Sequence, residues 1–327
     1  MAANKDMAGE FDIIRRFFTH PARNAILGVG DDAALIVAAP EMELAISTDV
    51  LVAGTHFFAG ADPRRLGHKA LAVNLSDMAA MGAAPHYVTL SLTIPAADES
   101  WLREFSSGFM ALAHAHGVEL VGGDTSRGPL NIGVQIVGEV PKGQALRRVG
   151  AKVGDDIWVS GTLGDAALAL AHLLEKIALV PDDLARCETA LHTPVARVEL
   201  GQRLRGIASS AIDISDGLIA DLTHILDASR LAALIELEKI PRSVALNRQL
   251  PSEIGLRALL AGGDDYELCF TCAAAERARV LALSRELELP LTRIGRAEAG
   301  CGLTIRDTDG RVFDYEAMKM EGFDHFG

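Results

Sequence analysis

Acidic residues stand beside glycine-rich turns at several points along the chain. Carboxylate and hydroxyl oxygens are hard donors of the kind that Mg²⁺ and Mn²⁺ prefer, and the histidines do not cluster by spacing. The set therefore favours a magnesium-type site over a zinc site. Aspartate also suits turns and helix caps for local reasons, so each position taken alone has a structural explanation. The acids and the hydroxyls beside them are Asp31, Asp32, Ser47, Thr48, Asp49, Asp77, Asp124, Asp213, Ser215, Asp216, Asp264 and Asp265.

One of these acids, Asp77, falls inside a predicted helix. The pair Asp62-Pro63 resembles an N-cap followed by proline at the first helical position, and the helix runs to about Met81. Aspartate is a poor helix former, and Asn74 lies three residues earlier on the same helical face. A polar pair in an apolar, alanine-rich helix needs a reason, and we favour metal ligation.

Glycines before the acids would let backbone N–H groups approach a phosphate closely. The chain has no G-x-x-x-x-G-K-[ST] motif, which excludes a Walker-type P-loop, and GVGDDAAL lacks the third glycine of a Rossmann fingerprint. A formal net charge of -13 would repel a polyphosphate unless several divalent cations intervened. The candidate positive side chains are Lys69, Arg127, Arg147 and Arg148.

The stretch GGDDYELCFTC, residues 262–272, places two adjacent acids at the start of a predicted strand. Two carboxylates this close are costly to hold unless a cation lies nearby. From the residues alone, that cation could be a metal ion, a lysine or a charged substrate. Cys269 and Cys272 have CxxC spacing, but strand alternation would point them to opposite faces, which disfavours a shared metal.

Composition limits the class of protein. The 327 residues suffice for two domains, and 49% hydrophobic with 23% charged residues is typical of a packed globular protein. The negative net charge argues against binding to nucleic acid or to an anionic membrane surface. We find no apolar run of about 18 residues and no signal-peptide pattern, and four cysteines are few. We therefore expect a cytoplasmic protein.

The elements that position the acids mix helices and strands in both halves, which indicates an α/β or α+β class. The glycine- and charge-rich stretch 141–156 has little periodicity, and we place the domain boundary there, giving domains 1–145 and 146–327. A hairpin that turns at Asp309-Gly310 is expected near the end of the chain.

Taken together, the motifs resemble the thiamine-monophosphate kinase family. They occur in the family's order from Gly28 to Phe326. Single motifs are shared with aminoimidazole ribonucleotide synthetases, selenophosphate synthetases and a hydrogenase maturation factor, whereas STDVLVAGTHF with GGDDYELCF narrows the resemblance to the kinases. The motifs are GVGDDAAL, ISTDVLVAGTHF, HKALAVNLSDMAAMGAAP, VGGDTSRGP, SAIDISDGLIADL, GGDDYELCFT and GFDHF.

The resemblance implies a two-domain PurM-like architecture. The N-terminal domain would bind ATP and Mg²⁺ and pair with a second copy in a homodimer barrel, and a C-terminal α/β domain would add metal and substrate contacts. Several Mg²⁺ ions and ATP would lie in a cleft, and the γ-phosphoryl of ATP would pass directly to thiamine monophosphate. No general base is expected, because the acceptor phosphate oxygen is already anionic.

The resemblance also implies roles for single residues. At the position of Asp264 the family often has glutamate, and where this chain has Met320 it tends to have an aromatic residue, so Tyr315 is a further candidate to stack on the thiamine rings. Asp264 would face the positively charged thiamine. The cation expected near Asp264 and Asp265 would then be the substrate. The implied metal ligands are Asp32, Ser47, Thr48, Asp49, Asp77, Asp124, Asp213 and Asp216; the ATP contacts are Gly123, Asp124, Arg148 and Ser215; and the substrate contacts are His56, Asp264, Met320 and Phe323.

Three other functions stay open on sequence grounds. The protein could be another ATP-dependent enzyme of the same superfamily acting on a different small substrate. It could be a non-catalytic module that binds thiamine phosphates or nucleotides, although such a module would not need every metal ligand. It could also be a metal-dependent phosphohydrolase, which would need no acceptor.

Overall fold

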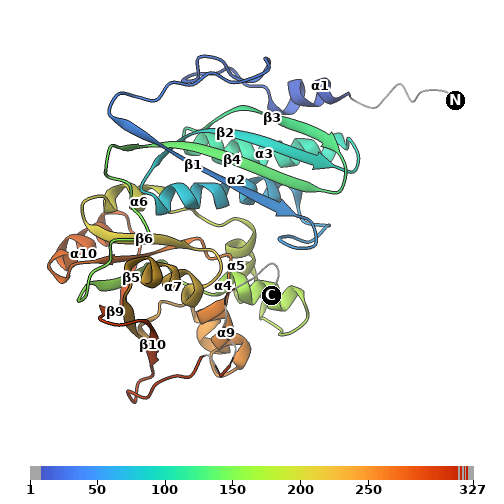
Figure 1. The fold of residues 1–327 in the computed structure, drawn as a ribbon. Helices are drawn as coiled ribbons and strands as arrows, with labels where there is room; N and C mark the ends of the chain where they lie inside the picture. The colour runs from blue at the N-terminus through green and yellow to red at the C-terminus, as the bar shows by residue number, and fades with distance from the viewer. Residues whose placement is uncertain (1–8, 316, 319, 321, 323–327) are drawn as a thin grey trace. The chain divides into compact units, whose positions relative to one another are not determined.

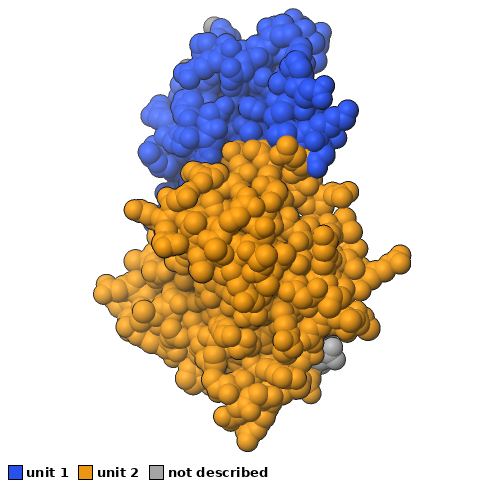
Figure 2. Space-filling model, turned by 90° about the vertical axis from the view of Figure 1, so that its left-hand side faces the viewer, with its two compact units in different colours: residues 1–78, 84–143 blue, residues 79–83, 144–327 orange. Residues whose placement is uncertain are grey.

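A computed structural model of the chain describes residues 9–315, 317, 318, 320 and 322. It divides into two compact units, coloured separately in Figure 2. Unit 1 comprises Met1–Met78 and Ala84–Gly143, and unit 2 comprises Ala79–Ala83 and Gln144–Gly327. The separate roles that we assign to domains 1–145 and 146–327 stay a prediction.

Unit 1 is built around a four-stranded sheet with the strand order β1-β4-β2-β3 (Figure 1). Strand β4 runs antiparallel to both β1 and β2, whereas β2 and β3 are parallel. In chain order its elements are α1 (Glu10–Ile13), the π-helical turn η1 (Ile14–Phe18), β1 (Met42–Val52), α2 (Pro63–Ala80), β2 (Ala84–Ile94), α3 (Glu99–Ala115), β3 (Glu119–Arg127) and β4 (Asn131–Pro141).

The sheet of unit 1 has one buried face and one open face. Along β4, Ile132, Val134 and Ile136 are buried, whereas Gln135 between them is exposed. This alternation follows from the two-residue period of a strand. Strand β1 shows the same alternation of buried and exposed side chains. Its residue Thr48 is paired with Gln135, so the exposed side chains of β1 lie on the same open face as Gln135.

Helices α2 and α3 approach each other closely at two glycines. A Cβ atom at Gly67 would lie 2.1 Å from the carbonyl oxygen of Phe105, and one at Gly108 would lie 1.9 Å from that of Arg64. Any larger residue would push the helices apart. The predicted cap of α2 is confirmed, because Asp62 Oδ1 accepts a hydrogen bond from the backbone N–H of Arg65 at 2.8 Å.

Unit 2 contains a six-stranded sheet with the order β10-β7-β9-β5-β8-β6. Every residue of β5 and of β8 is buried, which is typical of central strands covered on both faces. Its elements are β5 (Asp156–Ser160), α4 (Asp165–Leu173), α5 (Pro181–His192), α6 (Val198–Leu204), β6 (Ala208–Ile214), α7 (Leu218–Ser229), β7 (Ala232–Glu236), η2 (Leu237–Lys239), α8 (Val244–Gln249), α9 (Glu253–Ala261), β8 (Glu267–Cys272), η3 (Ala274–Glu276), α10 (Arg277–Glu286), β9 (Leu291–Glu298) and β10 (Gly302–Arg306).

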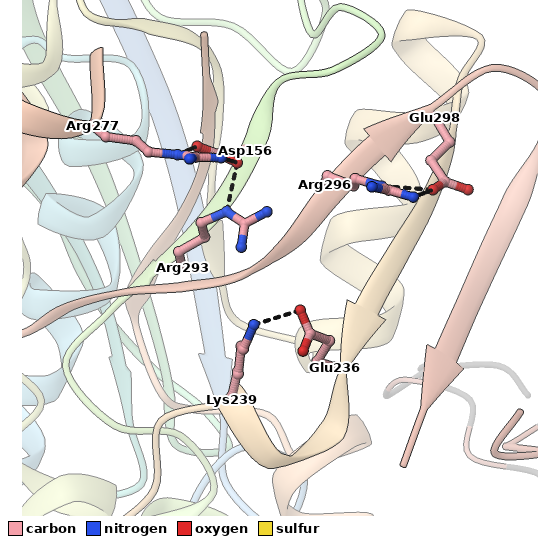
Figure 3. Close-up of polar contacts among 7 residues, drawn as sticks. All are labelled: Asp156, Glu236, Lys239, Arg277, Arg293, Arg296 and Glu298. Atoms are coloured by element: carbon pink, nitrogen blue, oxygen red, sulfur yellow. Dashed lines mark hydrogen bonds and ion pairs between the residues drawn. The ribbon is translucent and has the colours of Figure 1, made fainter. Parts of the chain in front are cut away.

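A buried acid links three elements of unit 2. Asp156, at the start of β5, accepts hydrogen bonds from Arg277 of α10 and from Arg293 of β9 (Figure 3). The distances from Asp156 Oδ1 to Arg277 Nη2 and to Arg293 Nε are 2.7 and 2.5 Å. Two guanidinium groups therefore offset the cost of burying this carboxylate.

Helices and sheets in both units confirm the expected α/β (α+β) class. The closing turn lies where it was expected: the backbone N–H of Asp307 donates to Arg311 at 3.0 Å, that of Phe313 donates to Ile305 at 2.8 Å, and an antiparallel bridge joins Arg306 to Val312. The second limb forms no longer strand, and β10 pairs in parallel with β7. Among the residues that the structure describes, no helix combines the length and apolar character needed to cross a membrane.

Candidate active site

Strand β1 carries three of the predicted metal ligands on two faces. Ser47 and Asp49 lie on the face whose β4 partners are buried. Thr48 lies on the open face, where Gln135 Nε2 donates a hydrogen bond to its Oγ1 at 3.4 Å. Because side chains alternate along a strand, the structure does not bring the hydroxyl of Thr48 to the side chains of its two neighbours.

Helix α2 brings Asp77 to this buried face of β1. The hydroxyl of Ser47 donates a hydrogen bond to Asp77 Oδ2. Asn74, one turn earlier, is fully buried, and its Nδ2 donates to the carbonyl oxygen of Ala70 at 3.1 Å. Its Oδ1 is also buried and accepts no hydrogen bond from any described residue. A buried oxygen in this state is costly, and a hard cation or a water molecule would satisfy it.

Asp32 lies in an exposed loop before β1, closed where Leu27 and Leu35 exchange backbone hydrogen bonds of 2.9 and 3.2 Å. Sequence reasoning missed the residue that holds the stretch just before this loop. The Glu119 carboxylate, at the start of β3, accepts hydrogen bonds of 2.8–3.3 Å from the backbone N–H groups of residues 23–25. These partners precede it by 94 to 96 positions, so no local pattern could reveal the contact.

Gly123 and Asp124 lie on β3, which is the edge strand opposite β1 in the same sheet. Gly123 has φ 148°, and a Cβ atom there would lie 1.9 Å from the carbonyl oxygen of Leu90, so only glycine fits. Asp124 is exposed and lies opposite Ser91 on the open face. Strands β1 and β3 are opposite edges of the sheet, about 14 Å apart at roughly 4.8 Å per step. Within one chain, Asp124 and Asp49 therefore lie at opposite edges of the sheet.

His56 lies in the turn that follows β1. Its Nδ1 accepts a hydrogen bond from the backbone N–H of Val52 at 2.9 Å. An imidazole that accepts through Nδ1 carries its proton on Nε2. An N–H at Nε2 is the kind of donor that pairs with an acceptor such as a phosphate oxygen.

In unit 2 the predicted ligands lie at the end of β6 and in the turn before α7. Asp213 is buried near the end of the strand, and Ser215 and Asp216 form the turn. Sequence reasoning missed Asp221 of α7, whose Oδ2 accepts hydrogen bonds from the backbone N–H groups of Ser215, Asp216 and Gly217. Burial raises the pKa of Asp221 to about 7; the carboxylates of Asp213 and Asp216 also raise it, and backbone donors partly offset the rise.

The loop before β8 places Asp264 against this turn. The N–H of Asp264 donates to the carbonyl oxygen of Ser215 at 2.9 Å, and that of Tyr266 donates to Ile214 at 2.8 Å. Asp264 and Tyr266 have φ values of 68° and 51°, left-handed conformations that cost energy and often mark functional sites. The hydroxyl of Tyr266 donates to Asp264 Oδ1 at 2.8 Å, which orients the carboxylate.

The neighbouring acids have internal partners. Both carboxylate oxygens of Asp265 lie 2.9 Å from the backbone nitrogen of Gly164, and burial raises its pKa well above the usual range. Glu267 accepts hydrogen bonds from Ser160 at 2.5 Å and from Arg197 Nε at 2.7 Å. Asp265 and Glu267 therefore have structural roles and fix the backbone next to Asp264.

The remaining predicted contacts differ in their surroundings. Arg148 is exposed, in a loop where Gly150 N–H donates to Ser229 Oγ at 3.2 Å. Met320 is 1% exposed and packs in the apolar core of unit 2, so the structure does not present it to a ligand. Phe323 lies outside the described residues.

The donor set fits magnesium in its chemistry. Within the described ranges, no three His, Cys, Asp or Glu side chains gather closely enough to hold a metal ion. Unit 1 nevertheless joins Ser47 to Asp77 beside the unsatisfied oxygen of Asn74, and all three supply hard oxygen donors. Metal binding by these residues stays a prediction.

Both units match known domains. Residues 30–140 match the family described as AIR synthase related protein, N-terminal domain, and residues 152–308 match its C-terminal domain. The chain is thus a two-domain protein of the AIR synthase related class, as the expected PurM-like architecture requires.

Comparison with individual proteins identifies the family within this class. The chain is 46% identical to Thiamine-monophosphate kinase of Escherichia coli (strain K12), over 97% of this chain and 98% of that protein. The crystal structure of Thiamine-monophosphate kinase from Stenotrophomonas maltophilia K279a is 46% identical, with a TM-score of 0.83 over 89% of this chain and 92% of that chain. AaThiL complexed with AMPPCP and TMP is 33% identical, with a TM-score of 0.76 over 91% and 92%. The chain belongs to the thiamine-monophosphate kinase family, which confirms the resemblance.

Proposed function

We propose that this protein transfers the γ-phosphoryl group of ATP to the phosphate of thiamine monophosphate, giving thiamine diphosphate and ADP. The match to curated thiamine-monophosphate kinases over 97% of the chain carries the proposal. A relative of the same architecture is complexed with AMPPCP, an ATP analogue, and TMP, which supports the pairing of a nucleotide with a phosphate acceptor.

The reaction needs little acid–base chemistry from the protein. The attacking phosphate oxygen is already anionic, so the obstacle is repulsion between acceptor and polyphosphate. Mg²⁺, when bound, would screen these charges and stabilise the transition state. Ser47, Asp49 and Asp77 would hold it in unit 1, and Asp213 and Asp216 would hold it in unit 2. Asp124 would serve a separate ion or nucleotide contact, because it lies on the opposite sheet edge from β1.

His56 and Asp264 would bind the substrate. The Nε2–H of His56 suits the phosphate of thiamine monophosphate, and the Asp264 carboxylate suits the thiazolium charge or the pyrimidine amine. Tyr266 fixes the carboxylate through its hydroxyl. The chain's own residues thus bind and orient the two anions rather than exchange protons with them.

We also propose that the protein is a homodimer. The open face of the sheet carries Leu44, Ile46 and Val50 of edge strand β1, with exposed fractions of 46%, 61% and 47%. Neighbouring apolar side chains on a long edge strand are a liability unless another surface covers them. The family resemblance implies that the open face of a second copy of the chain covers these side chains.

The assay for the function combines purified protein, ATP, Mg²⁺ and thiamine monophosphate, and separates products by chromatography. We expect thiamine diphosphate and ADP in equal amounts, and no ADP when thiamine monophosphate is omitted. Release of ADP and free phosphate without thiamine diphosphate would refute the proposal and favour a phosphohydrolase. Binding of both ligands without turnover would favour a binding module.

A further inference from the structure

The turn between β6 and α7 is organised by a single carboxylate oxygen. Asp221 Oδ2 lies 3.1, 3.0 and 3.1 Å from the backbone nitrogens of Ser215, Asp216 and Gly217. Three consecutive N–H groups therefore converge on one atom. The side chain that supplies this atom is 3% exposed, so little water competes for the donors.

This arrangement differs from ordinary helix capping. A capping box returns a side chain from the third helical residue to the N-cap N–H alone. Asp221 is the fourth residue of α7 after the N-cap Gly217, and two of its three donors belong to residues before the N-cap. The carboxylate thus fixes the shape of the turn rather than the end of the helix.

The other side of the turn is held by the loop that carries Asp264. The backbone N–H of Asp264 donates a hydrogen bond to the carbonyl oxygen of Ser215 at 2.9 Å. A Cβ atom at Gly263 would lie 2.5 Å from that same carbonyl oxygen, so the two segments are in close contact. A shift of the turn would therefore displace both the nucleotide and metal contacts and the loop that holds Asp264.

We infer that Asp221 is a positioning residue that holds the backbone of residues 215–217 in the conformation that binds the nucleotide and its metal ions. The inference deepens the proposed function and rests on the roles that it gives to Ser215 and Asp216. Asp221 is buried, so its effect on a ligand would pass through the backbone that it holds. In its ionised form, which predominates above its pKa of about 7, the carboxylate accepts stronger hydrogen bonds from N–H groups than an amide would.

The test compares Asp221→Ala and Asp221→Asn with Asp227→Asn, which changes an exposed acid of the same helix. Hydrogen exchange follows the amides of residues 215–217, and calorimetry follows the binding of AMPPCP with Mg²⁺. In Asp221→Ala we expect exchange at least about 10-fold faster at these amides and binding at least about 10-fold weaker. In Asp221→Asn we expect binding about 2- to 10-fold weaker, and Asp227→Asn should match the native protein.

Other outcomes would overturn the inference. Native-like binding by a folded Asp221→Ala, with faster amide exchange, would mean that the carboxylate only stabilises α7. Native-like exchange would mean that the three hydrogen bonds do not hold the turn. If Asp221→Ala fails to fold, Asp221→Asn decides, and binding within about 2-fold of native would reject the inference. Failure of native protein to bind AMPPCP with Mg²⁺ would instead reject the proposed function.

Discussion

At the scale of residues, the contact between Ser47 and Asp77 joins a strand to a helix. The hydroxyl donates to a carboxylate, and the unsatisfied amide oxygen of Asn74 lies one helical turn away from Asp77. The chemical character of this group was predictable, because Asn74 and Asp77 stand out as polar residues in an apolar helix. Asp221 and Glu119 were not predictable, because their partners are backbone N–H groups, which leave no mark in the sequence.

Asp77→Asn tests the metal assignment in unit 1. The substitution removes one negative charge and keeps the shape, so we expect turnover to fall at least about 10²-fold at saturating Mg²⁺. Steady-state kinetics measure the effect. Asp62→Ala is the control: it removes the cap of α2 and costs about 1 kcal/mol of stability, but should leave turnover unchanged. Near-native turnover in folded Asp77→Asn would remove Asp77 from the metal ligands.

At the scale of elements, local signals predicted helices and strands better than strand partners. The cap of α2 could be predicted because Asp62 and Pro63 stand next to each other at its start. The Asp309-Gly310 turn could be predicted from its own residues, whereas the pairing of β10 with β7 joins segments far apart in the chain and has no local signal. The left-handed loop at Asp264 depends in the same way on contacts with the turn after β6.

Asp156 joins β5, β9 and α10, and its contribution to stability should depend on pH. Burial alone would raise the pKa of Asp156, but hydrogen bonds from Arg277 and Arg293 outweigh it and hold the pKa below its usual value. The stabilisation is therefore complete above about pH 4, the pKa of an unfolded aspartate, and is lost as the pH falls through the lower folded value.

Asp156→Asn should lower the free energy of unfolding by about 1–2 kcal/mol at pH 7, less than for a fully buried pair, because the arginines are 48% and 30% exposed. Urea unfolding at several pH values measures the difference, which should shrink below about pH 4. Glu298→Gln is the matched control, since its ion pair with Arg296 is exposed (Figure 3) and should contribute within about 0.5 kcal/mol. A difference in unfolding free energy that grows as the pH falls would contradict the predicted direction of the pH dependence.

At the scale of the whole molecule, the open face of unit 1 predicts self-association. Ile46→Asp places a charge among Leu44, Ile46 and Val50 and should convert a dimer to a monomer. Light scattering after size exclusion should give twice the chain mass of 34.7 kDa for the native protein and 34.7 kDa for the variant. Leu281→Asp, at an exposed position of α10, should remain dimeric. A monomeric native protein would contradict the proposed homodimer.

The contact between Glu119 and residues 23–25 has a consequence for the order of folding during synthesis. Residues 23–25, which precede the loop of Asp32, leave the ribosome long before Glu119, because 94 to 96 positions separate the partners. Closing so long a loop carries an entropic cost that local contacts do not share. The stretch that leads into the loop of the first predicted ligand is therefore held in place only after β3 has been synthesised.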